Sequence, residues 1–200
     1  MTSDQFVPFV LAGVAIIVSP GPATVLVAAT GASFGLRSAY RLIAGLVSSM
    51  VIIAVAIGSG LTSVVALYPA VLPVLSLTAV VYMLYLAYRI ATAPPIVEPG
   101  GHPPTFWSGF VLNFINPKAY AAVAALFGGF VLVDSNPIHD AVLKGGGMIG
   151  IIVIGHSLWA LGGAVIARVV RRRQTFRRIN VGFAVALVAA VLASAFGLMR

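Results

Sequence analysis

Apolar residues fill six long stretches of the chain, and short polar connections separate them. The stretches are residues 6–32, 39–60, 72–92, 105–133, 145–167 and 180–199. A helix needs roughly 20 mainly apolar residues to cross a bilayer, and each stretch meets that length. The pattern therefore predicts an all-α integral membrane protein with six transmembrane helices. The short connections predict one membrane domain over residues 1–200, with no separate soluble domain.

Helix breakers interrupt the first and the fourth stretch. Ser19-Pro20-Gly21-Pro22 stands between two apolar runs, and Asn116-Pro117-Lys118 stands inside 105–133. Proline has no N–H and its ring clashes with the preceding turn, so a helix breaks at both places. The missing donors predict unpaired backbone carbonyls at Ile16, Val18 and Asn113.

Unpaired backbone groups at membrane depth need a partner, because each costs several kcal/mol in hydrocarbon. Free carbonyls suit an ammonium group. The half-helix that begins near Ala23 offers free N–H groups and the positive end of its dipole, which suit a carboxylate. The first break therefore predicts a site for a small zwitterion.

The chain also divides into two halves of three stretches each. Repeat 1 covers about 6–93, the proline-rich and glycine-rich linker covers 94–104, and repeat 2 covers about 105–199. Because three is odd, the second repeat is expected to be inverted relative to the first. Matching broken helices in inverted repeats are typical of a transporter's midplane binding site. The alternative is two unrelated proline kinks, which membrane helices tolerate.

Few polar side chains fall inside the predicted spans. Lys118 is the one charged residue there, and two roles fit it: binding a substrate carboxylate or changing protonation, or capping open carbonyls and snorkelling. His156 is the one histidine there, and it fits either proton coupling or a structural hydrogen bond. Asn113 and Asn116 fit substrate contacts or hydrogen bonds between helices.

Composition supports the membrane class and argues against an enzyme. Hydrophobic residues make up 60% of the 200 residues and charged residues only 8%, whereas soluble domains carry about 25% charged residues. The chain has no cysteine. All four acidic residues lie outside the predicted spans, so neither a metal cluster nor a nucleophile with its base is expected at membrane depth. We expect no cofactor and no catalytic activity.

Positive charges predict the orientation. Six of the twelve lie between residues 168 and 178, from Arg168 to Arg178. The positive-inside rule places that stretch, with Arg37, Arg41 and Arg89, in the cytoplasm, next to anionic lipid headgroups. Both termini are then expected on the opposite side. A basic cytoplasmic loop therefore accounts for the net charge of +8, and we do not expect nucleic-acid binding.

The motifs together make the chain similar to the LysE/RhtB-type amino-acid exporter family, the LysE translocators. The matching residues are Ser19-Pro20-Gly21-Pro22, Gly45, Tyr82-Met-Leu-Tyr85-Leu86, Gly109, Asn113 and Asn116-Pro117-Lys118-Ala119. The resemblance implies alternating-access export of amino acids or close derivatives across the bacterial inner membrane. It also implies a proton gradient as the driving force, and a homodimer.

Three departures from that family shape the expected substrate. Many relatives carry an acid after the glycines of the second span, where this chain has Gly45-Leu-Val-Ser-Ser-Met50. Many carry an acid before the fifth-span tryptophan, where this chain has His156, and Pro-Gln-Phe where it has Gly128-Gly129-Phe130. Without an intramembrane acid we expect neutral or hydrophobic amino acids, with Lys118 and His156 as candidates for proton coupling. The alternatives are export of another small metabolite or an inorganic ion, and a channel-like membrane subunit.

Overall fold

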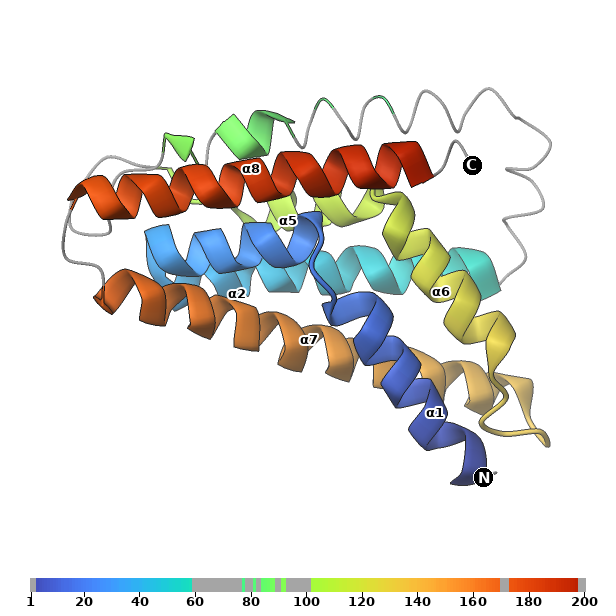
Figure 1. Ribbon diagram of the computed structural model, residues 1–200. Helices are drawn as coiled ribbons and strands as arrows, with labels where there is room; N and C mark the ends of the chain where they lie inside the picture. Colours follow the sequence, from blue (N-terminus) through green and yellow to red (C-terminus); the bar gives the residue numbers. More distant parts are fainter. Residues whose placement is uncertain are drawn as a thin grey trace.

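Helices make up the regular structure of the protein. The computed structural model describes residues 3–58, 77, 81, 84–88, 91–92, 102–169 and 173–197. Within these residues no strand occurs, which confirms the all-α class. The predicted third span 72–92 is described at nine of its 21 residues, and the linker 94–104 lies outside the described residues except for 102–104. The elements are α1 (Ser3–Gly13), the π-helix η1 (Val14–Val18), α2 (Pro22–Gly58), α5 (Phe106–Phe114), α6 (Pro117–Gly129), α7 (Pro137–Val169) and α8 (Arg173–Gly197) (Figure 1).

Two of the described helices are long and apolar enough to cross a membrane, Pro22–Gly58 and Pro137–Ala167. A third span results if Phe106–Phe114 and Lys118–Gly129, which meet at 66°, are counted together. These helices agree with a helical membrane protein. They do not by themselves establish six spans.

Helix α2 reverses direction at Gly35. This glycine has φ 77° and ψ 173°, a positive φ that side chains strongly disfavour. Residues 22–24 and residues 46–50 contribute to one cavity, so the two arms, 22–34 and 36–58, fold back on each other (Figure 1). The connection predicted between the first two spans is therefore a turn at one glycine.

Four glycines bring α2 into backbone contact with its neighbours. A β-carbon added to any of them would overlap a carbonyl oxygen of the facing helix, so no larger residue permits the same approach. One reciprocal pair joins the second arm of α2 to α5, and the other joins the first arm to α7. The contacts are Gly45 with Phe106, Gly109 with Leu42, Gly31 with Ala160, and Gly163 with Ala28.

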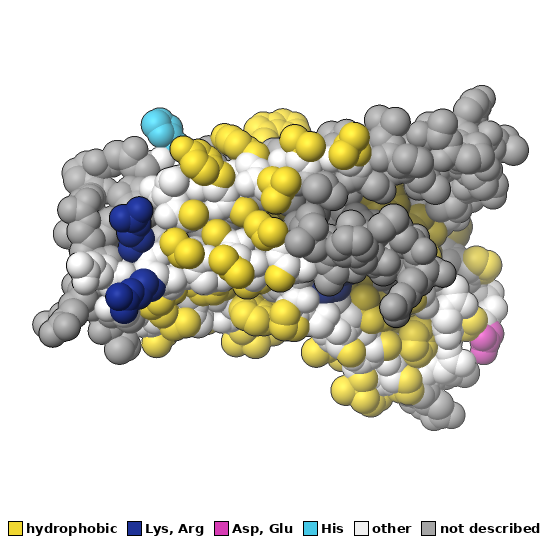
Figure 2. All heavy atoms as spheres, turned by 45° about the horizontal axis from the view of Figure 1, so that its top comes forward, with side chains coloured by type: hydrophobic (Ala, Val, Ile, Leu, Met, Phe, Trp, Pro, Cys, Tyr) yellow, Lys and Arg dark blue, Asp and Glu magenta, His cyan; other side chains and the backbone are white. Residues whose placement is uncertain are grey.

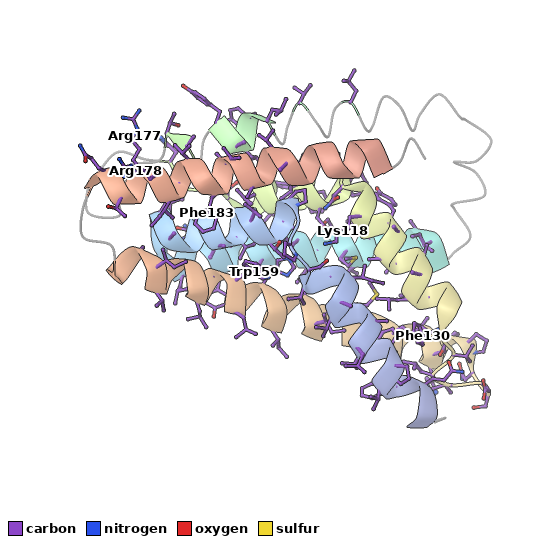
Figure 3. All side chains as sticks on the ribbon, viewed as in Figure 1. Lys118, Phe130, Trp159, Arg177, Arg178 and Phe183 are labelled. Atoms are coloured by element: carbon purple, nitrogen blue, oxygen red, sulfur yellow. The ribbon has the colours of Figure 1, made fainter. Side chains whose placement is uncertain are left out.

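Charge separates the two ends of the molecule. Arg37 and Arg41 follow the turn at Gly35, and Arg177 and Arg178 lie in the first turns of α8; all four are exposed. Figure 2 shows Lys and Arg side chains at this end and an acidic side chain at the opposite end. The described part of the chain begins in α1 and ends in α8, at the end opposite the arginines (Figures 1 and 3).

Helix α7 begins earlier than predicted, and this corrects the placement of two charges. It starts at Pro137 rather than at residue 145, so Asp140 and Lys144 belong to its first turns and not to an open connection. The Lys144 ammonium lies 2.5 Å from Asp140 Oδ2 and donates to Phe127 O at 3.0 Å. Lys144 is only 3% exposed, because the ion pair satisfies its charge where the α6–α7 connection folds over it. Helix α8 likewise starts before the predicted span, at Arg173.

Candidate functional site

Both predicted helix breaks are present. Helix η1 ends at Val18, Ser19 is extended with ψ 148°, and α2 starts at Pro22. Helix α5 ends at Phe114, and Asn116 caps the start of α6. π-Helical turns such as η1 are rare and are frequent at functional sites.

The two breaks border one small cavity between the two halves of the chain. Its volume is about 30 Å³, which is enough for a water molecule and far below the roughly 150 Å³ that holds a benzene-sized ligand. In this conformation the cavity is closed to an amino acid. Its lining residues are Ile16, Ile17, Gly21, Pro22, Ala23, Thr24, Leu46, Met50, Asn113, Asn116, Lys118, Ala119, Ala122, Ile152 and His156.

Lys118 reaches from the second break to the first. Its ammonium donates to Ser19 O at 3.1 Å and to Ser19 Oγ at 2.9 Å. A β-carbon at Gly21 would lie 3.1 Å from Lys118 Nζ, so glycine at this position leaves the ammonium its space. The structure thus brings Ser19, Gly21 and Lys118 together, and it shows Lys118 capping a carbonyl of the opposite half.

The predicted unpaired carbonyls are paired, which corrects that expectation. Ile16 O accepts from Ser19 Oγ at 3.0 Å, and Val18 O accepts from Trp159 Nε1 at 3.0 Å. Asn113 O accepts from the Asn116 N–H at 3.1 Å. A buried carbonyl left without a donor is costly, and side chains or the local turn supply each donor that proline removed.

Trp159 is a site residue that the sequence analysis missed. It lies on α7, and Figure 3 labels it and Lys118 near the middle of the molecule, where the first helix breaks. The sequence did contain a hint of this contact. A buried indole N–H usually has an acceptor, and the prolines leave carbonyls free to accept it. Thr24 was also missed: its Oγ1 accepts from the Gly21 N–H at 2.8 Å and fixes the turn before α2.

The start of α2 offers two backbone donors to the cavity. No hydrogen bond is found from the Ala23 or Thr24 N–H within the described residues, whereas the Val25 N–H donates to Gly21 O at 3.0 Å. Pro22 has no N–H at all. Ala23 and Thr24, at the positive end of the α2 dipole, border the cavity together with Lys118.

The two asparagines have structural partners. Asn113 Nδ2 donates to Leu46 O at 3.1 Å and to Ser49 Oγ at 2.9 Å, which joins α5 to α2. Asn116 Oδ1 accepts from the Lys118 N–H at 3.1 Å and caps α6. Both residues border the cavity, but their main hydrogen bonds hold the walls in place.

His156 presents an unpaired nitrogen at the same cavity. Its Nδ1 lies 3.0 Å from Ile152 O, so the proton of a neutral ring sits on Nδ1 and Nε2 is left as an acceptor. The side chain is 3% exposed, and among the described residues Nε2 is the one buried side-chain nitrogen or oxygen without a partner. Such a group in a native structure calls for a ligand, a water or an ion.

Aromatic side chains close the molecule on the side away from the arginines. The rings of Phe9 in α1 and Phe130 after α6 meet edge to face at 5.8 Å, and Phe9 is fully buried. Gln5 Oε1 accepts from the Val131 N–H at 2.8 Å beside them. Figures 1 and 3 show α1 and α6 slanting towards this end, where Phe130 is labelled. These contacts hold the outer halves of the two broken helices together.

The fold and the cavity define a helical membrane protein with a polar pocket between two broken helices. The family model for the LysE type translocators matches residues 14–197. The chain belongs to this family, whose members are transport proteins and not enzymes. The match confirms the family expected from the motifs.

Named relatives agree with the family match. The chain is 30% identical to a cysteine/O-acetylserine efflux protein of Escherichia coli (strain K12) and to one of Shigella flexneri. It is 29% identical to that of Escherichia coli O139:H28. Each alignment covers 85% of this chain and 87% of the relative. A comparison with solved structures gave no significant match. Family and relatives together support an amino-acid exporter of the bacterial membrane.

Proposed function

We propose that this protein exports small neutral amino acids, or close derivatives, through the cavity between its two broken helices. The observation that carries the proposal is the contact of Lys118 with Ser19, which joins the two breaks at a buried polar pocket. A charged residue inside a membrane protein is costly and marks a substrate or ion pathway.

The substrate carboxylate would bind where the hydrogen-bond donors gather. Lys118 Nζ and the free Ala23 and Thr24 N–H groups border the same cavity. A carboxylate there would meet a full positive charge and the positive end of α2. It would compete with Ser19 for Lys118 and so loosen the bond that holds the two halves together.

The substrate ammonium would bind His156 Nε2. The freed carbonyls first expected in this role are already paired, and Nε2 is the one buried side-chain acceptor that the described residues leave without a partner. None of the cavity residues is acidic, so a cationic side chain would find no counter-charge. Cysteine and O-acetylserine, which the relatives' names specify, are neutral zwitterions of fitting chemistry.

His156 Nε2 would also couple transport to protons. A neutral Nε2 accepts a hydrogen bond from the ammonium, whereas a protonated Nε2 cannot accept and repels it. Proton and substrate would then exclude each other at His156, as an antiporter requires. Lys118 would act with it by holding the carboxylate and setting the charge of the cavity.

The transport cycle would be one of alternating access. The closed cavity of about 30 Å³ has to widen before a substrate enters. We propose two inverted repeats, about 6–93 and 105–199 joined by 94–104, which rock around the site. Both termini would face away from the cytoplasm, as the arginines at the opposite end support. A homodimer in the inner membrane is proposed as the assembly.

Counterflow in proteoliposomes tests the proposed function. Vesicles loaded with unlabelled O-acetylserine should accumulate labelled O-acetylserine transiently, with saturation, because a carrier exchanges substrate faster than it returns empty. Lysine inside the vesicles should not drive this exchange. Saturable lysine counterflow at a comparable rate would refute the neutral-substrate proposal. Flux without saturation or counterflow would indicate a channel.

The replacement of His156 by leucine tests proton coupling. In the wild-type protein an imposed proton gradient should accelerate O-acetylserine efflux. In His156→Leu the gradient should lose its effect while counterflow persists with a raised KM, because a ligand acceptor is lost and Lys118 remains. His139→Leu, an exposed histidine outside the cavity, is the matched control and should behave as wild type. An unchanged gradient response in His156→Leu would remove His156 from the coupling step.

A further inference from the structure

An apolar groove lies along α7, and one residue each of η1, α2 and α8 completes its lining; it shares no residue with the cavity between the helix breaks. Its volume is about 290 Å³. Every lining residue is apolar or glycine. They are Val18, Ala28, Gly155, Leu158, Trp159, Gly162, Gly163, Ile166 and Phe183.

The groove has the length of one lipid leaflet and opens outward. Gly155 and Ile166 stand at its two ends on α7, and their separation along a helix is about 16 Å. That is close to half of the roughly 30 Å hydrocarbon core of a bilayer. Leu158 on its rim is 63% exposed and Ile166 is 42% exposed. At Gly162 a β-carbon would meet nothing within 4 Å, so the groove has free space there.

Two exposed arginines lie at the same end of the molecule as the Ile166 end of this groove. The Ile166 end lies within a turn of the end of α7, and α8 then begins at Arg173. Figure 3 shows Arg177 and Arg178 at that end of α8, with Phe183 further along the same helix. No acidic residue follows Asp140 in the sequence, so no carboxylate of α8 neutralises these two exposed charges.

We propose that the groove and these arginines bind one anionic phospholipid of the arginine-side leaflet. One acyl chain would lie along the groove, and its phosphate would meet Arg177 and Arg178. The headgroup of a zwitterionic lipid carries an ammonium group, which the two arginines repel. The arginines therefore favour an anionic headgroup. Each arginine should favour the anionic headgroup about fivefold. The acyl chain would pack against Trp159, whose indole N–H donates to Val18 O at the first helix break.

Tryptophan fluorescence can report the bound lipid directly. The chain has two tryptophans, and Trp107 is 66% exposed on α5. Trp107→Phe therefore leaves Trp159, in the groove, as the one emitter. This variant is reconstituted in phosphatidylcholine vesicles that contain a small fraction of a lipid with brominated acyl chains. Brominated phosphatidylglycerol should quench the Trp159 fluorescence more strongly than the same fraction of brominated phosphatidylcholine. Equal quenching by the two lipids would overturn the proposal.

Substitutions in the same background separate headgroup from groove. Replacing both arginines, Arg177→Gln with Arg178→Gln, should reduce quenching by the phosphatidylglycerol to the phosphatidylcholine level. Gly162→Leu should fill the groove and reduce quenching by both lipids. Gly150→Leu, also on α7 and also facing open space, is the control and should change neither. If both lipids quench only weakly, and Gly162→Leu does not change that quenching, a protein surface such as a second copy covers the groove and the proposal is refuted. A headgroup preference that survives the arginine changes would equally refute the proposal.

Discussion

Lys118→Met should reduce amino-acid export at least about 30-fold, the equivalent of losing one charge-assisted hydrogen bond of about 2 kcal/mol in the pocket. Methionine keeps an unbranched side chain, one atom shorter than that of lysine, and removes the ammonium. The substrate carboxylate then loses its main partner, and Ser19 loses the contact that joins the two breaks. The measurement is the initial rate of O-acetylserine counterflow in proteoliposomes, corrected for the amount of inserted protein.

A thermal measurement separates lost binding from lost folding. Substrate that binds the folded protein raises its Tm. O-acetylserine should raise the Tm of the wild type and of Ser19→Ala, which keeps the ammonium and the Ser19 carbonyl. It should leave the Tm of Lys118→Met unchanged. A full substrate-induced shift in Lys118→Met would place the carboxylate elsewhere.

Gly45→Ala should cost about 2 kcal/mol of stability, a typical cost of overpacking a tight contact. The added β-carbon would overlap Phe106 O and crowd the Phe110 N–H. Both are backbone atoms of α5 and cannot turn aside as a side chain can, so the helices must separate. The expected readout is a lower Tm and a lower midpoint of denaturant unfolding in detergent.

Gly150→Ala provides the matched control for this experiment. It is the same change on α7, where a β-carbon meets nothing within 4 Å. Alanine favours helix over glycine by up to about 1 kcal/mol, so Gly150→Ala should be neutral or stabilising. Gly109→Ala, the reciprocal contact with Leu42, should resemble Gly45→Ala. Equal stability of Gly45→Ala and Gly150→Ala would contradict the close approach of α2 and α5.

Much of the fold was predictable, because its causes are local. The apolar stretches predicted helices of membrane length, and Pro20, Pro22 and Pro117 predicted the two breaks through the N–H groups that they lack. Of the predicted substrate-binding residues, five border one cavity, namely Gly21, Pro22, Asn113, Asn116 and Lys118, whereas Ser19, Pro20 and Pro117 do not line it. Helix ends were less predictable, since apolarity does not show that Asp140 and Lys144 pair within α7.

The partners of the freed groups could not be predicted. The sequence alone shows that Ile16 and Val18 lose their helical donors, because Pro20 and Pro22, four residues onward, have no N–H. That Ser19 and Trp159 supply the replacement donors follows from the packing of the helices. Trp159 stands 141 positions after Val18 in the chain, and contacts of that separation depend on how helices pack rather than on local pattern.

The same distinction holds for the glycines and for the site. The chain has 21 glycines, and composition does not tell which of them face another backbone. Among those that the structure describes, the packing of α2 against α5 and α7 brings four against a backbone carbonyl. The sequence determined where a polar pocket could form. The tertiary structure decided that its carbonyls are already paired and that His156 Nε2 is left free, because hydrogen bonds go to whichever groups the packed helices bring within reach.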